Sequence, residues 1–502
     1  MKKALIFAFL AICDPIRKLL MRWQMAYGIL FLSSLRGFRE TVGRWKAWRA
    51  FENARKNCPA YADLLAKHPE AKVRLVGWTP DFSAIPPMDK PNYIKPYSLA
   101  QKCVGGKLPM RGAVIDESSG STGKPNNWVR GPAEREYVSR VLQISLHQML
   151  GNSPLMFINA FALGPWATGM CVSMAVVDVC LLKSTGPEVS KIINTLKDFG
   201  PGYRYVIAGY PPFLKMLADC KDVDWSQYDI TAFFGGEAIS ENMRDYLRQS
   251  FRGGVFGDYG ASDLEINIAA ESEFTIAVRK LIIENPAVRS RLNRRFGDAT
   301  PSVFQFNPME YLVETNAEGE LLITICRSSN VSPRIRYNIH DLGHVVQYHE
   351  VIAELKAAGV DLSKLPAPIA ELPVMFMYGR SDFSVGYYGC KITPGEVESI
   401  LYGLPELARR INAFALVTSE DAGNNKRLFV CLELAEGAEV PADITALTAQ
   451  IFDRLAQVNQ DYRESRKMVP AGYEPVLEFH AKQQGPFAAN DIRVKCRYIQ
   501  QR

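Results

Sequence analysis

A short run of hydroxyl, glycine and lysine residues in this 502-residue chain has the composition of an anion-binding loop. The run reads Ser118-Ser119-Gly120-Ser121-Thr122-Gly123-Lys124-Pro125. Its amides and hydroxyls can wrap an anion, as glycine-rich loops wrap nucleotide phosphates. The spacing differs from that of a P-loop, and Pro125 prevents a helix from starting on Lys124. The run therefore predicts a loop that holds phosphates, with a flexible linker as the alternative if it stood alone.

Later segments combine glycines with acidic residues in a similar way. Residues 232–239 are predicted to form a strand that runs into Gly235-Gly236-Glu237, with a helix beginning near Ser240. A glycine pair at the carboxyl end of a strand lets a flat ring approach the backbone closely. Residues 256–263 follow this segment, and residues 333–343 lie further along the chain. Both contain an aspartate among aromatic and glycine residues.

In chain order, these segments resemble the motifs of the adenylate-forming (ANL) superfamily, in its phenylacetate–CoA ligase-like branch. In that superfamily a carboxylic acid attacks the α-phosphate of ATP and gives an acyl-AMP. Tyr259-Gly260-Ala261-Ser262-Asp263 resembles the Tyr-Gly-x-Ser/Thr-Glu motif. Residues 336–343 resemble Arg-Tyr-x-x-Gly-Asp-Leu/Ile-Gly, and residues 378–382 resemble the Gly-Arg-x-Asp hinge. Residues 85–90, before the first loop, also resemble this branch.

The resemblance implies how a nucleotide is held. Tyr259 would stack on or near adenine, and Ser262 would contact the α-phosphate. Asp341 would bind the ribose, because one carboxylate can accept from both ribose hydroxyls. The implied nucleotide-binding residues are Ser118, Ser119, Gly120, Ser121, Thr122, Gly123, Lys124, Gly235, Gly236, Glu237, Asp258, Tyr259, Gly260, Asp341 and Arg380.

Two departures from the superfamily motifs fall on the nucleotide site. Asp263 stands where the family usually has the glutamate that holds Mg²⁺, so direct coordination could become water-mediated. Glu265, two residues on, is a candidate substitute. His340 stands where the family has glycine, which adds bulk beside the ribose.

The resemblance also implies a hinged lid that carries further catalytic residues. Arg380 would reach the nucleotide, Asp382 would be the pivot, and Gly389 and Lys391 would lie on the loop that faces the thiol. The family's catalytic lysine follows a glycine near the C-terminus, but this chain has no such pair there. By spacing Asn490 or Asp491 occupies that place, and Lys495 is the nearby stand-in. The implied catalytic residues are Lys495, Ser262 and Arg380.

The acyl pocket is the least defined part of the implied site. Gly164 and Trp166 lie in a segment that borders this pocket in the family. The alternative for either residue is ordinary core packing. Residues 271–310 match the family least, and their arginine-rich stretch is interpreted as a surface insertion.

Hydrophobic periodicity predicts the elements that position these residues. The fold class that the resemblance implies is α/β, a large N-terminal multi-sheet domain with a small hinged C-terminal lid, and the alternation of strands and helices agrees with it. We expect a basic arm over 1–45, an ATP- and acyl-binding domain over 46–381 and a mobile lid over 382–502. The predicted elements are helices over 133–150 and 445–458, and strands over 155–158, 411–418, 427–434 and 476–479.

The N-terminal arm carries the chain's positive charge. Of a formal net charge of +6, residues 1–50 carry +8 and the rest −2, so nucleic-acid binding is not expected. The apolar run 4–13 is too short to span a bilayer and lacks a cleavage site for a signal peptide. Aromatic and basic residues are interleaved along the arm as a whole, which predicts either contact with an anionic membrane surface or helices packed on the main domain.

The length of the chain and its cysteines bear on the number of domains and on the cellular compartment. A chain of this length should fold as more than one domain. Its ten cysteines include no Cys-x-x-Cys pair, which indicates reduced thiols and a cytoplasmic location.

The function implied by the resemblance is activation of a carboxylic acid with ATP and Mg²⁺, followed by thioester formation with CoA. One alternative is transfer of the acyl group to an amine, a carrier protein or another protein. A second alternative is release of the nucleotide conjugate itself. An alternative of another class is an inactive nucleotide- or acyl-binding protein at a membrane surface.

Overall fold

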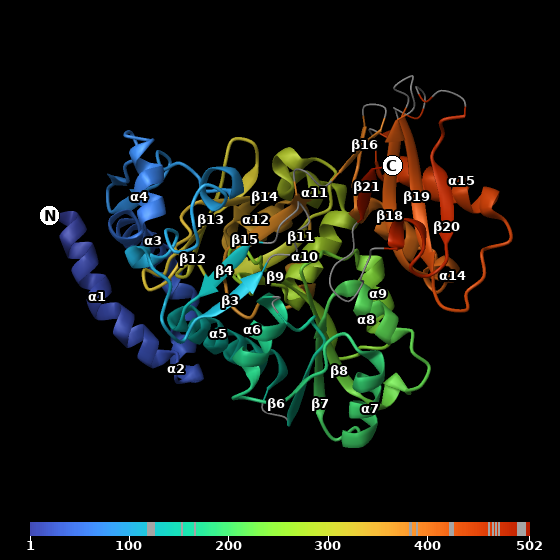
Figure 1. Ribbon diagram of the computed structural model, residues 1–502, viewed down its shortest axis with the longest axis horizontal. Coiled ribbons are helices and arrows are strands. Elements are labelled where there is room, and N and C mark those ends of the chain that lie inside the picture. The colour runs from blue at the N-terminus through green and yellow to red at the C-terminus, as the bar shows by residue number, and fades with distance from the viewer. Residues whose placement is uncertain are drawn as a thin grey trace. The chain divides into compact units, whose positions relative to one another are not determined.

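The computed structural model describes residues 1–117, 126–151, 154–164, 167–380, 384–387, 390–420, 426–459, 462–463, 466, 469, 472–488 and 498–501. Its packing forms two units, whose elements are labelled in Figure 1. Unit 1 comprises Met1–Ser153, Leu163–Cys180 and Asp258–Gly379, and unit 2 comprises Pro154–Ala162, Leu181–Gly257 and Arg380–Arg502. The domain boundaries at 45 and 382 stay predictions, and Asp382 lies outside the described residues.

Helices form the N-terminal part of unit 1. Rings of α1 pack edge-on against rings of α3, with centroids 5.5 Å apart for Phe7–Trp48 and for Phe9–Trp45. The Lys3 ammonium lies 2.7 Å from the Glu52 carboxylate. The arm is therefore packed on the rest of unit 1. The helical elements of this N-terminal part of unit 1, which extends beyond the arm, are α1 (Lys2–Leu20), α2 (Gln24–Gly28), η1 (Ile29–Phe31), η2 (Ser33–Leu35), α3 (Arg36–Asn57) and α4 (Pro59–Ala66).

The main sheet of unit 1 is largely antiparallel and has the order β12-β13-β14-β15-β11-β10-β9. Its strands are β9 (Gly254–Tyr259), β10 (Ala269–Ala270), β11 (Ser302–Phe306), β12 (Tyr311–Thr315), β13 (Glu320–Ile325), β14 (Tyr337–Val346) and β15 (Val374–Arg380). Two hairpins accompany it, β1 (Arg74–Val76) with β2 (Thr79–Asp81) and β3 (Val114–Glu117) with β4 (Asn127–Arg130).

The interpretation of residues 271–310 as a surface insertion is wrong. Phe274, Val278 and Ile282 of α10 pack in a buried apolar cluster with Val303 of β11. The apolar side chains recur at helical spacing, but the interpretation gave more weight to the arginine-rich stretch that follows α10. The helical elements of unit 1 beyond its N-terminal part are η3 (Lys90–Ile94), η4 (Val104–Gly106), α5 (Pro132–Leu150), α6 (Ala167–Val176), α10 (Glu273–Glu284), α11 (Pro286–Leu292), η6 (Arg294–Phe296), α12 (Tyr348–Ala357) and η7 (Leu362–Lys364).

Unit 2 begins with a sheet of order β9-β8-β7-β5-β6, in which β5, β6, β7 and β8 run parallel. Nearly all residues of β7 are buried, as expected for a strand covered on both faces. The elements are β5 (Leu155–Asn159), β6 (Leu181–Ser184), α7 (Val189–Phe199), β7 (Arg204–Gly209), α8 (Pro211–Ala218), η5 (Trp225–Gln227), β8 (Asp229–Gly235) and α9 (Glu241–Arg248).

A second, smaller sheet of order β20-β19-β18-β21 forms the C-terminal part of unit 2. The predicted strands over 411–418, 427–434 and 476–479 and the helix over 445–458 are all present. The elements are β16 (Val385–Tyr387), β17 (Cys390–Ile392), α13 (Pro394–Tyr402), α14 (Pro405–Ala408), β18 (Ile411–Glu420), β19 (Lys426–Leu434), α15 (Ile444–Val458), β20 (Val476–His480), η9 (Gly485–Phe487) and β21 (Ile499–Gln501).

Candidate active site

The β3–β4 hairpin closes the predicted phosphate loop at its base. The two strands pair from Val114 opposite Arg130 to Glu117 opposite Asn127. Residues Ser118, Ser119, Gly120, Ser121, Thr122, Gly123 and Lys124 lie outside the described residues, so their phosphate contacts stay predictions.

The end of β9 leads into a tightly folded loop that carries most of the predicted motif. The Ala261 amide donates to the Glu265 carbonyl at 3.0 Å, and the Ile268 amide donates to the Tyr259 carbonyl at 2.8 Å. A Cβ on Gly260 would lie within 2.9 Å of the backbone of Glu265 and Asn267. Glycine is therefore required at 260 for the loop to fold back on itself.

Tyr259 and Asp341, the residues predicted to lie at adenine and ribose, are in direct contact. The Tyr259 hydroxyl donates a hydrogen bond of 2.6 Å to the Asp341 carboxylate, although 82 residues separate them in sequence. Next to this pair, burial and then the charge of Glu271 raise the pKa of Asp258 to about 7. The predicted nucleotide residues of unit 1 thus gather at the end of β9 and on β14.

Arg130 at the end of β4 holds the loop after β9, and sequence reasoning missed it. Its guanidinium donates to the carbonyls of Ser262 and Leu264 and, at 3.0 Å, to the Asp116 carboxylate. A buried arginine whose donors are shared between two segments fixes their relative position. The base of the phosphate loop and the Ser262 loop are therefore tied together by one side chain.

Asp263, the predicted metal ligand, sits between cationic and hydroxyl groups. Its Oδ2 lies 3.1 Å from the Lys90 ammonium and accepts from the Tyr337 hydroxyl at 3.1 Å. The Arg334 guanidinium donates to the Asp263 backbone carbonyl at 2.7 Å. Lys90 is held there because Met88 pairs with Tyr337 at the start of β14. Lys90 is the last residue of the 85–90 segment, whose resemblance to the family did not predict that Lys90 lies beside Asp263.

A single carboxylate fits a Mg²⁺ ion that also binds substrate phosphates, because such ions usually take one or two protein carboxylates and keep several waters. Glu265 has one carboxylate oxygen engaged and one without a partner. Its Oε2 accepts from the Tyr311 hydroxyl at 2.6 Å and pairs with the buried Arg327 guanidinium. Its Oε1 is buried with no hydrogen-bond partner among the described residues, so Glu265 as a substitute for Asp263 at the metal stays a prediction.

Glu265 also ends a buried chain of charges that begins in the arm. Arg327 bridges Glu265 to Glu310, whose carboxylate lies 2.5 Å from Lys46 and 2.8 Å from Arg17. Burial alone would raise the pKa of Glu310, but the charges of Arg17, Lys46 and Arg327 lower it to about 2. Helices α1 and α3 are thereby linked electrostatically to the loop that carries Asp263.

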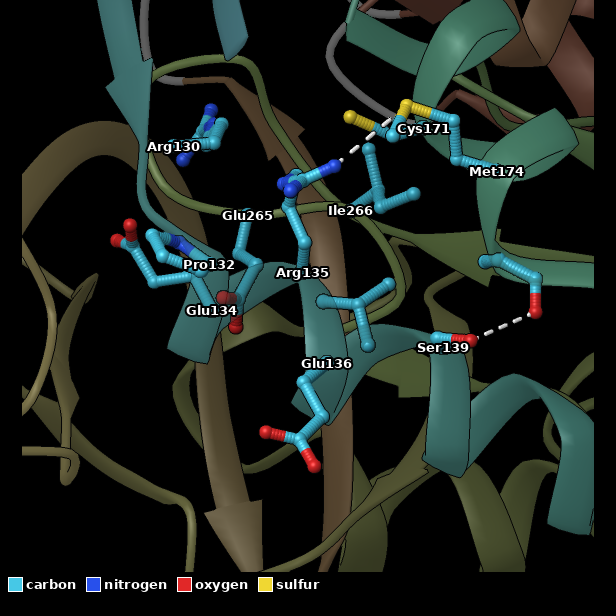
Figure 2. Close-up of a pocket in the computed structure, with 12 residues that line it drawn as sticks. Arg130, Pro132, Glu134, Arg135, Glu136, Ser139, Cys171, Met174, Glu265 and Ile266 are labelled. Atoms are coloured by element: carbon cyan, nitrogen blue, oxygen red, sulfur yellow. Dashed lines mark hydrogen bonds between the residues drawn. The ribbon is translucent and has the colours of Figure 1, made fainter. Parts of the chain in front are cut away.

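A cavity of about 240 Å³ lies in unit 1 beside the same loop (Figure 2). Most of its surface is apolar, and α5 and α6 supply most of its wall. Burial raises the pKa of the Glu134 carboxyl to about 7, although the Arg130 charge opposes this shift. The lining residues are Arg130, Pro132, Glu134, Arg135, Glu136, Val138, Ser139, Cys171, Met174, Ala175, Glu265 and Ile266.

The glycine pair predicted to lie against adenine ends a strand of unit 2, as expected. β8 ends at Gly235, and Gly236 has a φ of +82°. A Cβ on Gly236 would lie 2.7 Å from the Tyr210 ring, so the backbone here does accommodate a flat ring from its own chain. Glu237 accepts a hydrogen bond of 2.9 Å from the Tyr498 hydroxyl. The adenine role of Gly235, Gly236 and Glu237 stays a prediction.

His340 has a backbone conformation that explains why the family has glycine there. Its φ is +67°, in the left-handed region, where histidine is tolerated better than most residues. Its Nδ1 lies 3.0 Å from the Glu320 carboxylate, so the ring turns toward β13. The substitution therefore keeps the turn and adds an ion-pairing group.

Several predicted site residues, or their side chains, lie outside the part of the chain that the structure describes. Trp166, Asp382, Gly389 and Lys495 lie outside the described residues, as do Asn490 and Asp491. Arg380 ends β15 and Lys391 lies on β17, but their side chains are not described. Gly164 has a φ of +99° with open space around it. Its place in an acyl pocket stays a prediction.

No protein-family model and no curated protein matches the chain. Solved structures do match it. The 2-hydroxyisobutyryl-CoA ligase in the postadenylation state, in complex with R3-HIB-AMP, gives a TM-score of 0.64 at 14% identity over 92% of this chain and 90% of that one. The same ligase with 2-HIB-AMP and CoA in the thioesterification state gives 0.53 at 13% identity, over 93% and 90%.

This chain has the fold of that ligase. The match covers nearly all of both chains, so it includes the large multi-stranded sheet and the smaller C-terminal sheet. The predicted fold class is confirmed. At this identity the match concerns the fold, and the chemistry depends on the residues described above.

Proposed function

We propose that the protein activates a carboxylic acid with ATP through an acyl-AMP and then transfers the acyl group to CoA. The observation that carries the proposal is the hydrogen bond between Tyr259 and Asp341. Two residues expected at adenine and ribose meet across the sequence, on the fold of a ligase solved with an acyl-AMP and CoA. Membership of the phenylacetate–CoA ligase-like branch is part of the same proposal.

In this proposal the substrate carboxylate attacks the α-phosphate in line and pyrophosphate leaves. Asp341 orients the ribose, and the Ser118–Lys124 loop and Lys90 lie against the phosphates and stabilise their charge. Asp263 would hold Mg²⁺, which when bound neutralises charge on the phosphates. Arg130 positions Ser262 by holding its carbonyl. The first test is detection of an enzyme-bound acyl-AMP by mass spectrometry after incubation with ATP and candidate acids.

We further propose that the cavity beside the Ser262 loop receives the acyl group. Its mostly apolar wall is formed by α5 and α6, which come before and after the segment that contains Gly164 and Trp166, and a volume of about 240 Å³ suits a small acid. Cys171 is not a nucleophile, because burial and then the Asp116 carboxylate raise the pKa of its thiol to about 12.

Replacing Cys171 with phenylalanine is expected to raise KM for the acid about tenfold while KM for ATP stays unchanged, because the ring fills the cavity. Steady-state kinetics with the acid and ATP varied separately measure this. The matched control is Cys180→Phe, which makes the same change just beyond α6, outside the cavity lining. An unchanged KM for the acid in Cys171→Phe would place the acyl group elsewhere.

The acyl group needs an acceptor after adenylation, and we propose that this acceptor is CoA. CoA is favoured because the matched ligase was solved with it. An amine, a carrier protein or another protein is the alternative, as is release of the nucleotide conjugate, and an acceptor screen after adenylation separates them. An inactive binding protein is the candidate of another class, and it would bind ATP without forming acyl-AMP.

We propose a cytoplasmic location for the protein, because ATP and CoA are available there. We also propose peripheral membrane contact through residues 1–45. Fractionation of cells that express the tagged protein tests the location.

A further inference from the structure

The outward side of α1 carries a row of exposed apolar side chains. The row consists of Leu5, Phe9, Ile12, Ile16 and Leu19, whose spacing places them on one face of the helix. Their exposed fractions run from 37% for Phe9 to 66% for Ile12. A different side of the same helix, with Ile6, Leu10 and Arg17, is buried against unit 1. We call the five exposed residues the outer row.

The outer row belongs to a larger concentration of exposed apolar residues. Trp23, Ile29, Leu32 and Phe38 follow it and are also exposed. Of the 28 large hydrophobic residues that are exposed in the described part of the chain, ten lie within the first 38 residues. Single exposed apolar residues are ordinary on protein surfaces, but a contiguous group marks an interaction surface. In Figure 1, α1 lies at the margin of unit 1.

Of the basic side chains near this surface, some pair with carboxylates of unit 1 and others form no ion pair within the part of the chain that the structure describes. Lys3, Arg17 and Arg49 pair with carboxylates of unit 1. Lys18, Arg22 and Arg36 form no ion pair with any carboxylate of the described residues. The surface therefore combines apolar bulk with uncompensated positive charge.

We infer that the outer row docks on an anionic lipid surface, with α1 lying in the plane of the interface. An apolar face flanked by lysine and arginine is the composition of helices that lie in the headgroup region. Each basic residue near an anionic leaflet adds attraction. A second copy of the chain would instead bring Lys18 and Arg22 against the same basic residues. Among the described residues no helix is long and apolar enough to cross a membrane, so the contact is peripheral.

The test uses the full-length protein and flotation with vesicles made of equal parts of phosphatidylcholine and phosphatidylglycerol, or of phosphatidylcholine alone. The variant Ile12→Ser/Ile16→Ser/Leu19→Ser is expected to lower binding on the order of 100-fold, because three apolar side chains no longer enter the interface. The variant Lys18→Gln/Arg22→Gln/Arg36→Gln is expected to lower binding to the anionic vesicles about fivefold per charge, and to change binding to neutral vesicles little.

The matched control is Ile283→Ser/Ile369→Ser/Val440→Ser, which removes three exposed apolar side chains elsewhere on the chain. It should bind as the wild type does, and far-UV circular dichroism should be unchanged in all variants. Wild-type protein that stays off anionic vesicles would overturn the inference. It would also be overturned if the outer-row variant bound as the wild type does. A lipid-free dimer that the outer-row variant splits would assign the surface to a second copy instead.

Discussion

Replacing Glu310 with alanine is expected to lower the free energy of unfolding by about 3–5 kcal/mol. Its carboxylate is fully buried and is shared by Arg17, Lys46 and Arg327. Removing it leaves three buried cations, with Glu265 beside Arg327 and Asp14 beside Arg17 as the remaining acids of this cluster. Urea denaturation followed by circular dichroism and tryptophan fluorescence measures the change. Because Arg17 and Lys46 belong to α1 and α3, the arm should become sensitive to proteolysis as well.

The control for this variant is Glu354→Ala. Glu354 pairs with Arg291 at 2.9 Å on the surface, so its loss is expected to cost less than about 1 kcal/mol. The pH dependence gives a second check. The pKa of Glu310 is about 2 against an ordinary value of 4.5, so its ionised form stabilises the fold above pH 4.5. This contribution is lost as the pH falls through about 2, and the difference between wild type and variant should narrow accordingly. A difference below about 1 kcal/mol at neutral pH would contradict the account.

Replacing Lys90 with methionine is expected to lower the rate of acyl-AMP formation about 100-fold, the usual cost of removing one charge-stabilising group from an active site. Lys90 is the cation that lies against Asp263, at 3.1 Å, and it is partly exposed. In the proposed reaction it faces the phosphates. Asp263→Asn should cause a loss of similar size, because the carboxylate expected to hold Mg²⁺ is gone. Single-turnover formation of acyl-AMP measures both.

The double variant separates two roles for this pair. If Lys90 and Asp263 act as one unit, the double variant should lose little more than either single variant. Losses that multiply would mean that the two side chains contribute independently. The control is Lys95→Met, because Lys95 is an exposed lysine one turn further along. A Lys90→Met enzyme with wild-type rates would remove Lys90 from the site.

The helices and strands that were predicted correctly are those whose residues show a local hydrophobic pattern. The α5 helix, the β5 and β8 strands and the C-terminal sheet follow from hydrophobic periodicity, and the glycine pair fell at the end of β8 as expected. The motifs assigned Tyr259 to adenine and Asp341 to ribose, but the direct contact between them was not predicted, because no local rule joins residues 82 positions apart.

The parts that were missed depend on long-range contacts. Arg130 looks like any strand-end arginine until its guanidinium is seen to hold the Ser262 loop. The contacts of the Glu265 Oε2 atom with Arg327 and Tyr311 were not predicted either. The arm's basic residues pointed to surface charge, yet Arg17 and Lys46 are buried around Glu310. Charge pairing in the interior leaves no periodic signal in the sequence.

The most direct test of the proposed function is ATP–pyrophosphate exchange by the purified protein with Mg²⁺, against a panel of aromatic, aliphatic and hydroxy acids. We predict exchange with one class of acid and none without acid. Exchange that is lost in Asp341→Ala, while the protein stays folded, would tie the activity to the Tyr259–Asp341 site. Silence across the panel by a protein that still binds ATP would contradict adenylation and favour a nucleotide-binding protein without ligase activity.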